Sequence, residues 1–292
     1  MTVVKETPGL TTGRRVEGKV ALVTGAGQVD GPGVGTGKAS SLLLAHHGAS
    51  LVLVDREADR AEVTRKEIEQ AGGKAIVVQG DVTASADCER MIRAAVDEYG
   101  GLDILVNNVG VSTPGTIVEH AEEVFDHMLT VNLKSVFLVS RQAIPVMAAR
   151  GGGSIINISS IGALRSIGFP EYSAAKGGMI SLTRELAGQH GPDGIRVNVV
   201  VPGNIQTPRN LGTTAKLGRT VEESAVRAAE VLPLGRVARG TGWDIAYAVL
   251  FFARDESTWM TGQVLSADGG ASVSNPVSVV SAFQALRDRK DS

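Results

Sequence analysis

Cysteine is almost absent from this 292-residue chain, since Cys88 is the only one. A single thiol excludes an internal disulfide and a cysteine-based metal cluster, and it fits a reducing compartment. An excess of either charge is missing too, because 29 basic and 31 acidic residues leave a net charge of −2. Such a balance gives no electrostatic footprint for nucleic acid or for an anionic membrane surface. We therefore expect a small-molecule partner, with no nucleic acid and no membrane.

No uncharged apolar run reaches the roughly 18 residues that a membrane span needs. The first 18 residues carry Lys5, Glu6, Arg14 and Arg15 without an apolar core, so they do not read as a signal peptide. Together these observations predict a soluble, cytoplasmic protein. Aromatic residues make up only 4% of the chain, whereas glycine is abundant at 36 residues. Glycine gathers where predicted strands pass into helices, which indicates tight turns.

Residues 155–176 carry the strongest chemical signal. An apolar run from Ile155 ends in the hydroxyls of Ser159 and Ser160, as a buried strand would at its carboxyl end. A loop then leads into a helix on which Tyr172 and Lys176, four residues apart, share one face. An ammonium near a phenol favours the phenolate and lowers the phenol pKa. We therefore expect a tyrosine that exchanges protons near neutral pH.

A second signal lies near the start of the chain. An apolar strand at residues 19–24 runs into a glycine-rich turn, and a helix with apolar residues at helical spacing follows. Glycine lets the backbone approach a pyrophosphate closely, and a helix amino terminus offers unpaired N–H groups. This pattern favours a dinucleotide site over a flexible surface loop.

The glycine-rich turn near the start of the chain and the Ser, Tyr and Lys residues further on together resemble the short-chain dehydrogenase/reductase family. The signature of that family is an upstream serine followed by Tyr-x-x-x-Lys. The resemblance implies an α/β fold with a doubly wound parallel sheet of about seven strands, Rossmann-like and in a single domain. That domain would span residues 19–270, between an N-terminal extension at 1–18 and a tail at 271–292. Residues 207–235 would form a substrate lid. The family resemblance also implies a homotetramer formed through long helices.

The glycine-rich turn departs from the family pattern Thr-Gly-x-x-x-Gly-x-Gly. Gly25 and Gly37 match its first and last glycines, but residues 29–34 are six extra residues. Gly33 and Gly35 compete for the middle position. We favour Gly35, followed by Thr36, because this choice keeps the register of the helix.

The residue at the end of the second strand decides the expected cofactor. Asp55 can accept hydrogen bonds from both hydroxyls of an adenosine ribose and repels a 2′-phosphate, which favours NAD. Arg56 could instead accommodate that phosphate, so NADP is the less favoured alternative.

The resemblance supplies further cofactor contacts. Asp81 and Val82 match the segment that touches the adenine, although Asp81 is also a candidate N-cap for the next helix. Asn108 belongs to an Asn-Asn-Val-Gly turn beside the cofactor. Ile205 and Thr207 match the residues that hold the nicotinamide carboxamide.

Asn132 lies in a long predicted helix over residues 119–149, where asparagine is unfavourable. In the family, an asparagine at this position supports a water that links the catalytic lysine to solvent. The histidines lack ligand spacing, so we predict no metal site; they include His46, His47, His120 and His127.

Two serines compete for the active hydroxyl. The family spacing counted back from Tyr172 selects Ser159, whereas alternation of side chains along the strand selects Ser160, and we favour Ser160. The predicted reaction is hydride transfer between nicotinamide and a secondary alcohol or ketone, with Ser160, Tyr172, Lys176 and Asn132 as the catalytic group. An NADPH-dependent 3-oxoacyl-type reductase and a non-catalytic dinucleotide sensor are the alternatives.

Overall fold

The computed structural model describes residues 14–113, 115–216, 220, 223, 232–235 and 240–274. Two expectations fall outside these residues and stay predictions. One is a helix around residues 221–231, of which only Glu223 is described, and the other is a weak apolar stripe in the tail beyond residue 274. The boundaries drawn at residues 18 and 270 also stay predictions.

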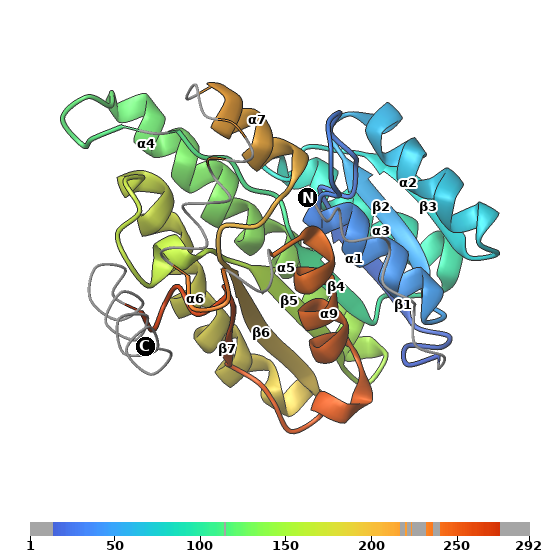
Figure 1. Ribbon diagram of the computed structural model, residues 1–292. Coiled ribbons are helices and arrows are strands. Elements are labelled where there is room, and N and C mark those ends of the chain that lie inside the picture. Colours follow the sequence, from blue (N-terminus) through green and yellow to red (C-terminus); the bar gives the residue numbers. More distant parts are fainter. Residues whose placement is uncertain are drawn as a thin grey trace, which may run out of the picture.

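Seven parallel strands form one sheet in the order β3-β2-β1-β4-β5-β6-β7 (Figure 1). The central strands β1 and β4 are buried at every residue and β6 at all but Arg196, and most of their residues are apolar, which is the pattern of a parallel sheet covered on both faces. The doubly wound fold expected from the sequence is therefore confirmed. The strands are β1 (Val20–Thr24), β2 (Ser50–Asp55), β3 (Lys74–Gln79), β4 (Ile104–Asn107), β5 (Gly153–Ile158), β6 (Ile195–Pro202) and β7 (Val264–Ala267).

Helices cover both faces of the sheet. Alternating residues of β1 show why, because Ala21 and Val23 pack into one apolar core and Val20 and Leu22 into the other. The first core contains residues of α1, α2 and α9, and the second contains residues of α3, α5 and α6. The helices are α1 (Thr36–His46), α2 (Ala58–Gln70), α3 (Ser85–Tyr99), α4 (Glu122–Leu129), α5 (Ser135–Ala149), α6 (Pro170–His190), α7 (Pro208–Lys216) and α9 (Gly242–Ala253).

The long helix expected over residues 119–149 is interrupted. It consists of α4, a π-helical turn at Thr130–Lys134, and α5. Asn132 lies in the π-helical turn, so the position that was unfavourable for a regular helix is not in one. Such π-helical turns are frequent at functional sites.

The strand order reverses between β1 and β4, because β1 pairs with both β2 and β4. In doubly wound sheets, ligands bind at this point, beyond the carboxyl ends of the strands. Within the described part of the chain, no helix is long and apolar enough to cross a membrane.

Candidate active site

The carboxyl ends of β1, β4, β5 and β6 lie side by side because these strands are parallel neighbours. Residues far apart in the sequence therefore meet at one edge of the sheet. The glycine-rich turn follows β1, the Asn107–Gly110 turn follows β4, and the two serines follow β5. The described residues contain no group of three His, Cys, Asp or Glu side chains that could hold a metal ion.

The two serines face different partners. The Oγ atom of Ser159 donates a 2.9 Å hydrogen bond to the backbone carbonyl of Lys176, which ties β5 to α6. The Oγ atom of Ser160 accepts a 3.2 Å hydrogen bond from the N–H of Gly162, and its hydroxyl lies close enough to Tyr172 to act on the pKa of the phenol. Ser160 is thus the serine whose hydroxyl meets the tyrosine.

The phenol of Tyr172 does not have the pKa that the sequence suggested. Burial raises its pKa above the ordinary value, and the hydrogen bond from Ser160 and the charge of Arg209 only partly oppose this. The expected lowering of the phenol pKa by the neighbouring ammonium is therefore wrong. The Nζ atom of Lys176 lies 5.8 Å from the centre of the phenol ring, but its own charge is disfavoured by burial.

Lys176 is almost completely buried, with 2% of its surface exposed. Burial, followed by the charge of Arg209, lowers its pKa to about 7. Its Nζ atom donates a 2.8 Å hydrogen bond to the carbonyl of Ile158, at the end of β5. The side chain is therefore held at the sheet edge, beside the phenol.

Asn132 fixes the turn after β4 next to Lys176. Its Oδ1 atom accepts from the N–H of Val111 at 3.1 Å, and its Nδ2 atom donates to the carbonyls of Val111 and Met128 at 3.0 and 2.9 Å. Gly110 passes so close that a Cβ atom there would lie 3.0 Å from Asn132 Oδ1 and 3.3 Å from Lys176 Nζ. Asn132 and Lys176 thus face the same piece of backbone.

The first turn has the shape of a phosphate cradle. Gly25 has a positive φ of 65°, and a Cβ atom on Gly37 would lie 2.0 Å from the carbonyl oxygen of Gly25, so only glycine fits there. Gly35 is the N-cap of α1 and has no side chain to occupy the free amides of that helix, which begins at Thr36. Asn108 closes the turn, because its Nδ2 atom donates to the carbonyls of Thr24 and Gly25 at 3.1 Å each.

The six extra residues, 29–34, pack against the segment that follows β6. Gly31 and Gly33 both have positive φ, and added Cβ atoms would lie 3.4 Å from Pro208 Cβ and 3.3 Å from the carbonyl oxygen of Gln206, respectively. Gln28 links the two ends of the insertion through hydrogen bonds to Val29 and Gly33 at 3.0 and 3.3 Å. The insertion therefore bridges the glycine-rich turn and the start of the expected lid.

Asp55 and Arg56 differ in their surroundings. The carboxylate of Asp55 accepts from the N–H of Gly27 at 2.9 Å and from that of Glu57 at 3.1 Å, which places it against the glycine-rich turn. The side chain of Arg56 is 76% exposed and lies 3.8 Å from the carboxylate of Glu57. The Asp55 carboxylate is therefore part of the glycine-rich turn, whereas the Arg56 side chain lies in solvent.

Asp81 is not the N-cap that it was also expected to be. Its Oδ1 atom accepts from the N–H and hydroxyl of Thr83 at 2.8 and 2.7 Å, whereas the N-cap of α3 is Ala84. This local turn competes with capping, as short acidic side chains often do. Val82 is buried beside it.

The segment after β6 contains a residue that the sequence did not single out. Ile205 and Thr207 are buried, and Asn210 folds back to donate a 2.9 Å hydrogen bond to the carbonyl of Ile205. Arg209 extends from α7 and donates to the carbonyl of Gly110. Its charge lowers the pKa values of both Tyr172 and Lys176. The sequence showed Arg209 only as one polar residue of a lid, and no spacing pointed from it to Gly110.

Known proteins are similar to this chain in sequence and in fold. A family model described as enoyl-(acyl carrier protein) reductase matches residues 32–272. A 3-oxoacyl-(acyl-carrier-protein) reductase from Thermotoga maritima is 38% identical over 257 residues, covering 88% of this chain and 98% of that protein. A 2,5-dichloro-2,5-cyclohexadiene-1,4-diol dehydrogenase from Sphingobium indicum is 37% identical over 260 residues. The match covers 89% of this chain and 98% of the dehydrogenase.

Among solved structures, a short-chain dehydrogenase/reductase from Burkholderia xenovorans superimposes with a TM-score of 0.85 at 39% identity, covering 90% of this chain and all of that one. The chain belongs to the short-chain dehydrogenase/reductase family. It is an oxidoreductase of the class that acts on alcohol or carbonyl groups with a nicotinamide cofactor.

Proposed function

We propose that this protein transfers a hydride between NAD(H) and a secondary alcohol or ketone, with Tyr172 as the general acid and base. The meeting of Ser160, Tyr172 and the buried Lys176 at the end of β5 carries this proposal, because Lys176 Nζ lies 5.8 Å from the centre of the phenol ring and the Ser160 hydroxyl acts on the pKa of that phenol. The glycine cradle around Gly25 and Gly37 fits a pyrophosphate, and bound NAD(H) would supply or accept the hydride. Asp55 supports NAD over NADP because its carboxylate faces the glycine-rich turn at the end of β2.

Each residue has a defined task in this proposal. Ser160 donates a hydrogen bond to the substrate oxygen and polarises the carbonyl. Tyr172 gives its proton to that oxygen during reduction and takes it back during oxidation. Lys176 binds the cofactor ribose from its buried position at the end of β5. Asn132 holds the backbone at Val111 and supports a water path to Lys176.

The test is turnover of a panel of secondary alcohols and ketones, followed through nicotinamide absorbance at equal concentrations of NADH and NADPH. Tyr172→Phe should lower kcat by a factor of about 10² or more while NADH still binds, because the phenol acts in the chemical step. Near-full activity of this variant would refute the mechanism. NADH binding without turnover of any substrate would favour the dinucleotide sensor.

A second candidate is an NADPH-dependent 3-oxoacyl reductase, which is supported by the 38% identity to the Thermotoga maritima enzyme. Its substrate would be a 3-oxoacyl thioester. Preference for NADPH together with reduction of such a thioester would favour it over the NAD-dependent dehydrogenase. The cytoplasmic location stays a prediction.

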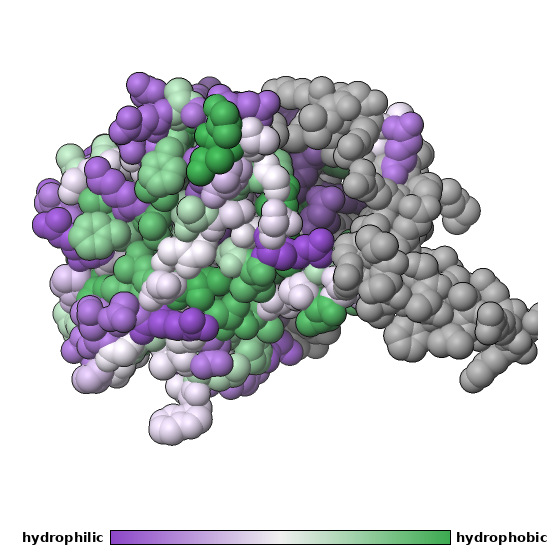
Figure 2. Space-filling view, turned by 90° about the vertical axis from the view of Figure 1, so that its left-hand side faces the viewer, coloured by the Kyte–Doolittle hydropathy of each residue, from purple (hydrophilic) through white to green (hydrophobic). Residues whose placement is uncertain are grey.

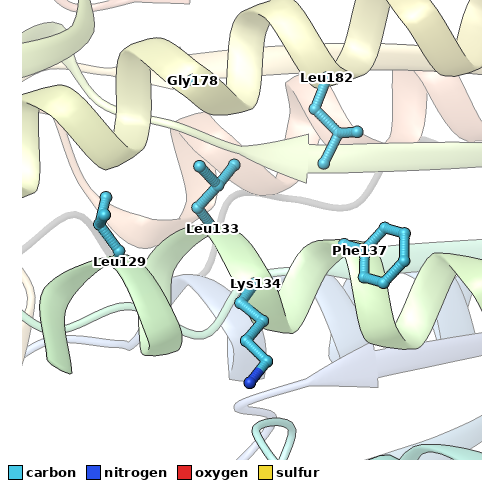
Figure 3. Close-up of a pocket in the computed structure, with 6 residues that line it drawn as sticks. All are labelled: Leu129, Leu133, Lys134, Phe137, Gly178 and Leu182. Atoms are coloured by element: carbon cyan, nitrogen blue, oxygen red, sulfur yellow. The ribbon is translucent and has the colours of Figure 1, made fainter. Parts of the chain in front are cut away.

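We further propose that the protein is a homotetramer. An apolar groove of about 350 Å³ lies between α6 and the helical segment formed by the π-helical turn and α5. Leu133 points across it toward α6 near Gly178 and Leu182 points back toward α5, whereas Lys134 points away (Figure 3). Figure 2 looks onto this side of the molecule and shows apolar side chains gathered among polar ones. The groove is lined by Leu129, Leu133, Lys134, Phe137, Gly178 and Leu182.

A second copy of the chain is the expected occupant, because Phe137 is 48% exposed beside the groove and large apolar side chains gain free energy when they are covered. Phe137→Glu should shift the mass measured by light scattering toward smaller species. An unchanged mass of four chains would show that this groove is not the interface, and a monomeric wild-type protein would refute the tetramer itself.

A further inference from the structure

A buried acid–base pair lies one residue away from Tyr172. The Nδ1 atom of His120 is 2.9 Å from Oε2 of Glu171, and the two side chains are only 9% and 4% exposed. Glu171 is in the first turn of α6, and His120 precedes α4, so the pair joins two segments that are distant in the sequence. The mechanism proposed above uses neither residue.

Glu171, the acidic member of the pair, has a pKa that favours the ionised carboxylate. Burial acts to raise the pKa of Glu171, but its backbone hydrogen bond and the hydrogen bond and charge of His120 outweigh burial, and the pKa is lowered. A buried carboxylate without such a partner is strongly unfavourable. The backbone hydrogen bond and His120 together therefore keep Glu171 ionised where it is buried.

The backbone before α4 is shaped around His120. Gly115 has a φ of 152°, and a Cβ atom there would lie 2.2 Å from Nε2 of the imidazole, so the ring packs directly on this glycine. Thr116 and Glu119 close the same turn, because the N–H and hydroxyl of Thr116 both donate to the Glu119 carboxylate at 2.7 Å. The imidazole is thus enclosed by its own turn on one side and by Glu171 on the other.

The position of Glu171 in the helix gives the pair its significance. The first turn of a helix lacks the i−4 acceptors that hold later turns, so tertiary contacts must fix its orientation. Lys176, one turn further on, is held by the carbonyl of Ile158 and by the link from Ser159. Tyr172 lies in the less supported first turn.

We propose that Gly115, His120 and Glu171 form a clasp that holds the first turn of α6, and with it Tyr172, at the distance and angle needed for proton transfer. His120 and Glu171 are positioning residues, because they act through Tyr172 and do not touch the reacting atoms. This inference rests on the proposed function for its kinetic consequence. The clasp itself can be tested without turnover.

The experiment compares four single variants, and the double variant that combines His120→Ala with Glu171→Ala, with the wild-type protein. His120→Ala and Glu171→Ala remove the clasp, and Glu171→Gln retains a hydrogen-bond acceptor for His120. His190→Ala is the matched control, because His190 and Asp193 form a second pair at the other end of α6 with the same 2.9 Å separation but greater exposure, 26% and 45%.

His120→Ala and Glu171→Ala should each lower kcat by about tenfold or more, since small misplacements of a reacting group are costly, while the Kd for NADH stays within about twofold. The double variant should lose little more than either single one. Glu171→Gln should recover much of the lost kcat, and His190→Ala should match the wild type. Amide hydrogen exchange should accelerate in residues 115–121 and 170–175 of His120→Ala, of Glu171→Ala and of the double variant, but not in His190→Ala.

Two results would overturn the clasp. One is unchanged hydrogen exchange in residues 170–175 of His120→Ala, and the other is a loss of kcat that is equal in His120→Ala and His190→Ala. If Glu171→Ala fails to fold, His120→Ala and Glu171→Gln still decide the question. Faster exchange in a protein that turns over no substrate would uphold the clasp and refute only the proposed reaction.

Discussion

The hydroxyl of Ser159 donates a 2.9 Å hydrogen bond to the backbone carbonyl of Lys176, so the two neighbouring serines at the end of β5 have separate roles. Ser160→Ala should lower kcat by a factor of about 10² to 10³, because it removes a donor from the substrate oxygen. Ser159→Ala should mainly lower the free energy of unfolding, by about 1 kcal/mol, since it deletes one buried hydrogen bond. Steady-state kinetics and urea unfolding of both variants check this. An inactive Ser159→Ala beside an active Ser160→Ala would reverse the assignment.

The burial of Lys176 predicts how stability depends on pH. Its pKa is about 7 in the folded protein, against 10.5 for the ordinary side chain. Between these values the unfolded chain binds more protons, so the free energy of unfolding should rise with pH, by at most about 1.4 kcal/mol per pH unit from this residue. Below about pH 7 both states are protonated and the contribution to the slope vanishes.

Urea unfolding between pH 6 and 10.5 measures this slope in the protein without cofactor. Lys176→Met lacks the titrating group, so the difference between the two proteins isolates its contribution. Equal slopes in the wild type and in Lys176→Met would contradict a lysine that is buried in its neutral form.

Asp55 should set the cofactor preference. Replacing it with serine removes a negative charge from the end of β2, where a 2′-phosphate would lie, so affinity for NADPH relative to NADH should rise by about tenfold or more. Arg56→Ala serves as the comparison, because its side chain is mostly exposed. Titration of cofactor fluorescence gives both dissociation constants. A preference that moves with Arg56 and not with Asp55 would mean that the guanidinium makes the choice.

Gly37 tests the phosphate cradle. Gly37→Ala places a methyl group against the carbonyl of Gly25 and should cost about 1 to 3 kcal/mol of stability, with a large loss of NADH affinity. Gly188, in α6, is a suitable control because a Cβ atom there meets nothing within 4 Å. Gly188→Ala should raise stability by about 0.5 to 1 kcal/mol, as alanine does in helices, and should leave cofactor binding unchanged. Calorimetry of both variants measures the contrast.

The insertion at residues 29–34 should slow the release of cofactor, because it braces the backbone at Gln206 and Pro208 from the side of the glycine-rich turn. Deleting these six residues should raise the dissociation rate of NADH by about tenfold, which is about 1.4 kcal/mol. Displacement of bound NADH by excess NAD in a stopped-flow instrument reports the rate directly. An unchanged rate in a folded deletion variant would show that the insertion only covers the surface.

Sequence alone was sufficient for the features that depend on local order. The apolar runs predicted the strands, and the spacing of Tyr172 and Lys176 on one helical face follows from 3.6 residues per turn. The strand predicted at residues 19–24, for example, is observed as β1 at Val20–Thr24. The interruption near Asn132 was not predicted, because residues 119–149 were expected to form one helix, although asparagine was recognised as unfavourable there.

Only the tertiary structure decided which groups meet and how deeply they are buried. The opposite partners of Ser159 and Ser160, the raised pKa of the Tyr172 phenol and the reach of Arg209 to Gly110 all depend on contacts between segments that are remote in the chain. The same holds for His120 and Glu171, which the sequence placed 51 residues apart without any shared pattern. The periodicity of a sequence shows which face of a helix or strand is apolar. How deeply a side chain is buried and which group it pairs with depend on the segment that packs against that face.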